Sequence, residues 1–164
     1  TMGAQVRLVG SGGERIVKLE TFFTGPGSNV MSQEVLAEIL VPIPKDASGS
    51  AFMALARNTS DISKVTCAVS ISMSGDKCDD IKIAMGAVAP RIVRAKQAEN
   101  IMTGQQIDNQ LIENAAESVV HDISPISDVR SNAEYRREVS KILVKRTIKQ
   151  AVKRALCMEL TSDY

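Results

Sequence analysis

Hydrophobic and polar residues alternate along the first part of the chain, which is the pattern of half-buried β-strands. Residues 4–19, AQVRLVGSGGERIVKL, contain two alternating segments on either side of a glycine-rich turn. Glycine adopts the positive φ angles that tight turns require, so this segment predicts a β-hairpin. A third strand is predicted at EVLAEILVPIP, where Pro42 and Pro44 end the pairing. Between these strands, TFFTGPGSN is expected to be a loop that Phe22 and Phe23 anchor.

Three more strand patterns follow the polar segment KDASGS, which is expected to be a linker and a domain boundary. They are SAFMALAR, KVTCAVSIS and IKIAMGAVA, and an acidic turn, SGDKCDD, is expected to join the last two. The second pattern alternates strictly, so its larger residues share one face: Val65, Cys67, Val69 and Ile71. Its other face has only small residues and is expected to lie under a helix: Thr66, Ala68, Ser70 and Ser72.

The rest of the chain has the periodicity of helices. One helix is predicted near residues 94–102, and Asp108 is expected to cap a second helix that ends near His121. The last helix is expected to run from about Ser131 to about Met158. Strands that precede helices in this order predict an α+β fold, in which helices cover a small antiparallel sheet.

The start of the last helix lies in the crowded segment SPISDVRSNAEYRREVSK. Ser131 and Glu134 have the spacing of a capping box, in which each side chain satisfies an amide of the first turn. An apolar stripe follows that is expected to be interrupted at Arg146 and Thr147. The stripe consists of Tyr135, Val139, Ile142, Leu143, Ala151, Val152 and Ala155. The segment is therefore interpreted as a helix start and not as a catalytic loop.

Composition narrows the possible functions. Lys and Arg total 20 against 19 Asp and Glu, so the net charge of +1 indicates neither a nucleic-acid partner nor a membrane contact. No apolar run reaches the roughly 18 residues that a membrane span needs. The cysteines Cys67, Cys78 and Cys157 form no CxxC pair, which is typical of reduced thiols and predicts a cytoplasmic location. His121 is the only histidine, so a histidine-based metal site lacks ligands.

Several segments invite a functional reading, but each has a simpler structural one. GSGGER resembles a phosphate-binding loop, yet a second strand follows it where a helix N-terminus is required. DKCDD lacks the ligand spacing of a calcium loop and is interpreted as a solvated turn. The last helix is basic and is either a contact surface or a solvated face. Its cations are Arg136, Arg137, Lys141, Lys145, Arg146, Lys149, Lys153 and Arg154. From these residues alone, no self-contained active site is predicted.

Five segments taken together resemble a known family. They are GERIVKLETFFTGPG, EVLAEILVPIP, RNTSDISKVTCAVSISM, IKIAMGAVAPRIVRAKQAE and ISPISDVRSNAEYRREVSKILVKR. In this order they are similar to the FAD-binding subunit of the molybdenum hydroxylases, the family of xanthine dehydrogenase and of the carbon monoxide dehydrogenase flavoprotein. The resemblance spans nearly the whole chain, and AMGAVAP with PISDVRSNAEYRR is its most specific part.

The resemblance implies a division of the chain and a cofactor. Residues 1–44 are similar to the tail of the FAD-binding domain, and residues 47–164 to the flavoprotein C-terminal domain. The glycine-rich motifs that hold the FAD pyrophosphate are expected in a missing N-terminal half, so this chain alone is expected to be inactive and not to retain FAD. The residues expected to face the flavin are Leu36 and a position where some members have lysine. That position falls on Met53 or Ala54, so the tuning charge that lysine supplies is absent.

The resemblance also implies partners. In this family a molybdenum cofactor subunit hydroxylates the substrate, and an iron–sulfur subunit passes the electrons to the flavin and then to an acceptor. This chain is expected to form one wall of the flavin pocket and to contact those subunits, without a catalytic residue of its own. The alternative is a non-catalytic binding or scaffold module that uses the basic last helix.

Overall fold

The computed structural model describes residues 1–58 and 60–159 of the chain. The chain divides into two compact units, Thr1–Pro44 and Lys45–Tyr164. Each unit has its own cluster of buried hydrophobic residues, and each is described by itself below.

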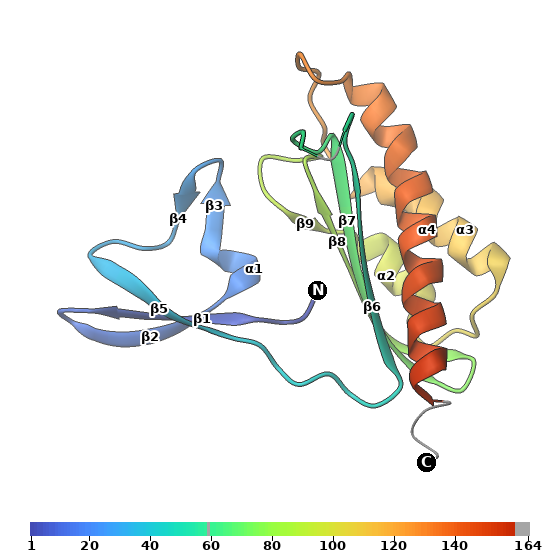
Figure 1. Ribbon diagram of the computed structural model, residues 1–164, viewed down its shortest axis with the longest axis horizontal. Helices are drawn as coiled ribbons and strands as arrows, with labels where there is room; N and C mark the ends of the chain where they lie inside the picture. The colour runs from blue at the N-terminus through green and yellow to red at the C-terminus, as the bar shows by residue number, and fades with distance from the viewer. Residues whose placement is uncertain (59, 160–164) are drawn as a thin grey trace. The chain divides into compact units, whose positions relative to one another are not determined.

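The first unit is built on a three-stranded antiparallel sheet (Figure 1). Strand β1, Gln5–Gly10, pairs with β2, Gly13–Lys18, and on its other side with β5, Glu34–Leu40. The predicted hairpin and the predicted third strand are both confirmed. Gly13 has a φ of +116°, which explains why the turn uses glycine. Strand β2, and not a helix N-terminus, follows this turn, so it lacks the setting of a phosphate-binding loop.

The segment between β2 and β5 is more regular than the loop predicted for it. A helical turn, α1 (Leu19–Phe22), is followed by a small hairpin of β3 (Phe23–Gly25) and β4 (Ser28–Asn29). Pro26 and Gly27 form the tight turn between these strands, and Gly27 has a φ of +68°, which allows the two strands to pair. Only one of the two expected anchors is buried, because Phe22 packs with Val6 and Leu8 while Phe23 is 46% exposed.

The second unit contains a four-stranded antiparallel sheet with the order β6-β7-β8-β9. Its strands are β6 (Ser48–Leu55), β7 (Val65–Ser74), β8 (Lys77–Gly86) and β9 (Val93–Arg94). All three predicted strands are present, and the short β9 was missed by sequence reasoning.

Two of these strands begin earlier than predicted. The first residues of β6, Ser48 and Gly49, lie opposite Ser72 and Ile71 of β7, so half of the expected linker KDASGS belongs to the sheet. The acidic segment after Asp76 is also strand and not turn, because β8 starts at Lys77 and pairs back to β7. The turn itself is short, and Gly75 with a φ of +60° makes it possible.

Helices cover one face of this sheet (Figure 1). They are α2 (Lys96–Met102), α3 (Asn109–Ser118) with a following 3₁₀ turn η1 (Val119–His121), and the long α4 (Ala133–Glu159). The carboxylate of Asp108 accepts a hydrogen bond from the amide of Leu111 at 2.7 Å, so the predicted cap is confirmed. Together with the sheet, these helices confirm the predicted α+β fold.

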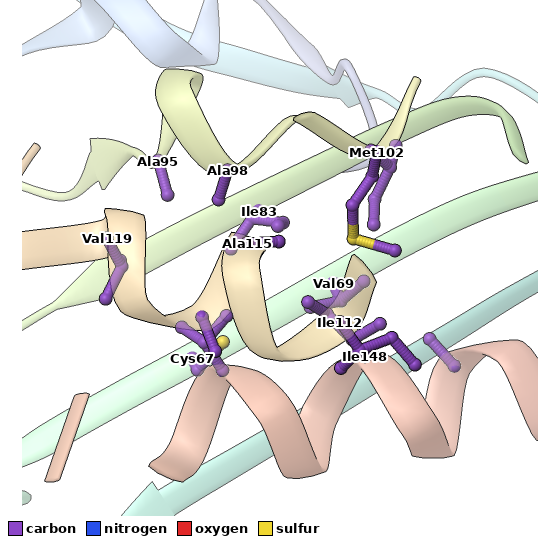
Figure 2. Packing of buried hydrophobic residues seen from close by; sticks show 14 of the residues in the cluster. Cys67, Val69, Ile83, Ala95, Ala98, Met102, Ile112, Ala115, Val119 and Ile148 are labelled. Carbon is purple, nitrogen blue, oxygen red and sulfur yellow. The ribbon is translucent and has the colours of Figure 1, made fainter. Parts of the chain in front are cut away.

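The core of the second unit lies between the helices and the apolar face of β7. Figure 2 shows Val69, Ile112 and Ile148, from β7, α3 and α4, gathered at one point of this core. The expectation that helices cover the small face of β7 was therefore wrong. The helices pack on the face of Val65, Cys67, Val69 and Ile71 because burial of larger apolar side chains releases more free energy.

The start of α4 differs from the predicted capping box. The side chain of Asn132, not Ser131, accepts a hydrogen bond from the amide of Tyr135 at 2.7 Å. Asparagine is among the best N-cap residues, and here it lies immediately before the first helical turn.

The buried stripe of α4 also differs in part from the prediction. Thr147 does not interrupt this stripe, because its hydroxyl donates to the carbonyl of Leu143 and is fully buried. By contrast, Tyr135 and Ile142 of the predicted stripe are exposed. The predicted end of this helix, Met158, lies within α4, but its side chain is outside the described part.

Candidate functional site

Leu36, the first residue expected to face a flavin, lies in the middle of β5. It is opposite Leu8 of β1, next to an irregularity in the pairing between Arg7 and Leu8. Its side chain is half-buried and packs against the buried cluster of the first unit, which contains Val6, Leu8 and Phe22. The exposed remainder of the side chain is apolar, which suits contact with a flat aromatic ring.

Met53, the second expected residue, lies on β6 opposite Cys67 of β7. It is half-buried and packs against the core of the second unit, so part of its side chain is engaged in the fold. Ala54, the neighbouring position that the resemblance also allows, is exposed on the opposite face of the strand. Neither position supplies a charge.

The described residues offer no loop of the kind that holds the phosphates of a nucleotide. A phosphate cradle uses a glycine loop between a strand and a helix, where free amides point at the anion. In residues 1–58 and 60–159 the glycine turns join β1 to β2, β3 to β4, β7 to β8 and α2 to α3. The pyrophosphate of FAD therefore has no holding loop in this part of the chain.

The most elaborate polar cluster of the second unit lies at the start of the last helix. Charge pairs between Asp128 and nearby arginines are expected there from sequence and are present, but the burial of one arginine was not predicted. Arg136, at the start of α4, is 2% exposed. Its guanidinium donates to the backbone carbonyls of Lys64 at 3.2 Å and Ala87 at 2.7 Å, and to the carboxylate of Asp128 at 2.7 Å. One side chain thus ties together the segment before β7, the segment after β8 and the segment before α4. We call this cluster the arginine clamp.

Asp128 completes the arginine clamp. Besides Arg136, its carboxylate accepts hydrogen bonds from the amides of Arg130 and Ser131 and from the guanidinium of Arg130. These contacts, above all the hydrogen bond from the Arg130 side chain, hold the pKa of Asp128 well below its ordinary value of 3.8. The sequence segment that predicts a helix start therefore also connects the start of α4 to two segments at the ends of β7 and β8.

A second buried charged residue, Glu99, provides a hydrogen-bond partner at the edge of the sheet. Glu99 of α2 is 5% exposed, and its carboxylate accepts hydrogen bonds from the amide of Ile83 and from the guanidinium of Arg94. Since β9 is only two residues long, the Ile83 amide at the edge of β8 needs a partner, and Glu99 supplies it. This buried carboxylate has a structural role and is not a candidate acid or base.

The basic surface predicted on α4 is largely engaged within the unit. Arg136 is buried, Lys141 pairs with Glu117 and Glu138, and Lys145 pairs with Glu113. Two further cations of the helix are also engaged: Lys149 donates to the Asn109 side chain, and Arg154 donates to the Ser50 carbonyl. Most of the cations of α4 therefore make contacts within the unit.

The remaining candidate groups show no catalytic arrangement. Burial raises the pKa of both Cys67 and Cys78 to about 12, so neither thiol is a nucleophile at neutral pH. The side chain of Cys157 lies outside the described part of the chain. His121 lies at the end of η1, near the predicted helix end, and its side chain is exposed. Among the described residues, no group of three or more His, Cys, Asp and Glu side chains is placed to hold a metal ion.

Comparison with known proteins defines the class to which this fold belongs. Residues 50–151, nearly all of the second unit, match the model of the family described as "CO dehydrogenase flavoprotein C-terminal domain". The chain belongs to this family, and the family resemblance found in the sequence is confirmed.

Individual relatives agree with this assignment. The chain is 31% identical to the glyceraldehyde dehydrogenase medium chain of Sulfolobus acidocaldarius, over 91% of this chain and 53% of that protein. It is 32% identical to the xanthine dehydrogenase FAD-binding subunit of Escherichia coli O157:H7, over 85% of this chain and 49% of that protein. A solved structure of carbon monoxide dehydrogenase from Hydrogenophaga pseudoflava superposes with a TM-score of 0.90 and 32% identity, over 93% of this chain and 54% of that chain.

The chain spans about half the length of the relatives it matches. Within the described residues, the helices are too short or too polar to cross a membrane.

Proposed function

We propose that this chain is the C-terminal part of the flavin subunit of a molybdenum-containing hydroxylase or dehydrogenase. The observation that carries the proposal is the family match over residues 50–151. Residues 1–44 would be the tail of the FAD-binding domain and residues 47–164 the flavoprotein C-terminal domain. The missing N-terminal half would hold the phosphates of FAD, which agrees with the lack of a phosphate cradle in the described residues. The parent enzyme would work in the cytoplasm.

In this role the chain contributes packing and not acid–base chemistry. FAD, when bound in the full-length subunit, supplies electron transfer from iron–sulfur clusters to an acceptor. Leu36 would present an apolar surface to the flavin ring and exclude water from it. Met53 would contribute the part of its side chain that the core leaves exposed. An iron–sulfur subunit and a molybdenum cofactor subunit would be the partners. In support, one relative is named as a medium chain and another as an FAD-binding subunit, which are names for one component of a larger enzyme.

Flavin content tests the proposal directly. The full-length subunit and the present chain would be purified side by side, and their flavin absorbance compared with protein concentration. We expect a yellow full-length subunit with about one FAD per chain and a colourless fragment, because the anion-binding loops lie in the other half. Stoichiometric FAD on the fragment, or none on the full-length subunit, contradicts the proposal.

Leu36→Asp in the full-length subunit tests the ring contact. A carboxylate against an apolar ring face loses its hydration without gaining a partner, so we expect flavin retention to fall at least about tenfold. Val35→Asp is the matched control, because Val35 is the adjacent residue of β5 and is 69% exposed. Thermal unfolding of both variants separates a lost contact from a lost fold. A folded Leu36→Asp subunit with normal flavin content removes Leu36 from the site.

A further inference from the structure

The turn that follows β8 contains a residue in an unfavourable backbone conformation. Ala87 has a φ of +62°, in the left-handed region that residues with a side chain rarely adopt. The methyl group of Ala87 is exposed, so its packing does not compensate for this cost. A residue other than glycine keeps such a conformation only where the surrounding structure holds it there.

The turn does not hold this conformation by hydrogen bonds of its own. In the part of the chain that the structure describes, no two backbone groups of residues 87–92 hydrogen-bond to each other. The carbonyl of Ala87 instead accepts from the guanidinium of Arg136 at 2.7 Å, and the carbonyl of Val88 accepts from the amide of Ser124 at 2.9 Å. The start of α4 and the segment before it therefore supply the support that the turn lacks.

The left-handed conformation has a use in the fold. Ala87 lies between Gly86, the last residue of β8, and Val88, which is fully buried in the core of the second unit. The change of direction at Ala87 lets the chain leave the strand and still bury the Val88 side chain. Two kinds of support are thus present, which are the burial of Val88 and the hydrogen bond from the arginine clamp.

A second left-handed residue of the same unit provides a comparison. Ala47 has a φ of +50° and lies immediately before β6. Its carbonyl accepts from the backbone amide of Met73 in β7 at 3.0 Å, whereas the donors of the arginine clamp go to other groups. The conformation of Ala47 is therefore independent of Arg136.

We infer that the arginine clamp is a latch, which holds the turn after β8 in a strained conformation that this turn does not keep by itself. Arg136 fixes the left-handed peptide at Ala87 and is itself held by Asp128. When the clamp is broken, the turn relaxes to a negative φ. The start of α4 and a turn 49 residues earlier are thus coupled through one side chain. This inference is independent of the proposed function.

Glycine at residue 87 tests the latch, because it removes the cost of a positive φ but adds freedom to the unfolded chain. Urea denaturation followed by circular dichroism would be measured for the wild type, Ala87→Gly, Arg136→Met and the double variant. In the wild type we expect Ala87→Gly to raise the urea midpoint by about 0.5 M, because the strain is relieved. In the Arg136→Met background residue 87 is already relaxed. There the same change is expected to lower the midpoint by about 0.3 M, because only the freedom of the unfolded chain increases.

Ala47→Gly is the matched control, and its shift in midpoint is expected to be the same in both backgrounds. A gain from Ala87→Gly that is equally large without Arg136 overturns the inference, since the turn and the buried Val88 would then hold the conformation alone. No gain in the wild type also overturns it, because Ala87 would then carry no strain.

A milder background keeps the test valid if Arg136→Met shows no cooperative unfolding. Asp128→Asn leaves the guanidinium in place but removes the anion that holds it. In this background the gain from Ala87→Gly is expected to fall by about half or more, because a charge-assisted hydrogen bond is roughly twice as strong as a neutral one. An unchanged gain overturns the inference.

Discussion

Arg136→Met is expected to lower the free energy of unfolding of the second unit by about 3 kcal/mol, as for other broken buried ion pairs. Methionine keeps the apolar stem of the arginine but removes every donor of the guanidinium. The carbonyls of Lys64 and Ala87 then lose their partner, and so does the carboxylate of Asp128. Urea denaturation followed by circular dichroism measures the loss.

The matched control is Arg137→Met, the neighbouring arginine on the same turn of α4. Arg137 is exposed, so its replacement is expected to change the free energy of unfolding by less than about 0.5 kcal/mol. Equal stability of Arg136→Met and the wild type would show that the clamp contributes nothing to the fold. It would also remove the argument that the clamp holds Ala87 in its left-handed conformation.

The clamp makes a specific contribution to the pH dependence of stability. The pKa of Asp128 is lowered from its ordinary value of 3.8, so its carboxylate binds fewer protons in the folded state than in the unfolded one. The stabilisation is therefore complete above pH 3.8 and is lost as the pH falls further, towards the folded-state pKa. We expect the stability difference between the wild type and Asp128→Asn to be constant near neutral pH and to shrink in acid. A difference that grows in acid contradicts this assignment.

Sequence patterns predicted the strands and helices of this fold better than the way in which these elements pack on one another. The alternation correctly placed Val65, Cys67, Val69 and Ile71 together on one face of β7, because side chains alternate between the faces of a strand with a period of two. The same rule could not say which face the helices would choose when the other face held small residues. That choice depends on packing between distant segments, which a local pattern does not contain.

The arginine clamp shows why charged residues are harder to place from sequence. Arg136 lies in a run of cations and was assigned to a basic surface, since arginine is rarely buried. Its burial depends on an acidic partner eight residues earlier and on two carbonyls from remote segments. The sequence contained one usable signal, which was the combination of Asp128 with two nearby arginines in the most family-specific segment. For Leu36 and Met53, the strand positions were predictable, but the role of each remains a prediction.

Gly49 of β6 marks the closest approach between the sheet and α4. A Cβ atom added to this residue would overlap the carbonyl oxygen of Ala151 and lie 2.5 Å from the amide nitrogen of Ala155. Both are backbone atoms of the helix, so a rotamer change cannot relieve the clash. Nearby, the guanidinium of Arg154 donates to the carbonyl of Ser50 at 2.6 Å, which fixes the helix against the strand.

Gly49→Ala is therefore expected to destabilise the second unit by about 3 kcal/mol, at the upper end of the usual cost of overpacking. The helix must move away from the strand, and the core between α4 and β7 opens with it. Ser50→Ala is the control, since Ser50 is the next residue of the same strand and is exposed, and the substitution keeps the backbone carbonyl that accepts from Arg154. Urea denaturation measures both variants. A Gly49→Ala protein as stable as Ser50→Ala would mean that β6 and α4 do not approach as closely as described. It would leave no physical reason for glycine at this position, because the backbone there has no left-handed φ.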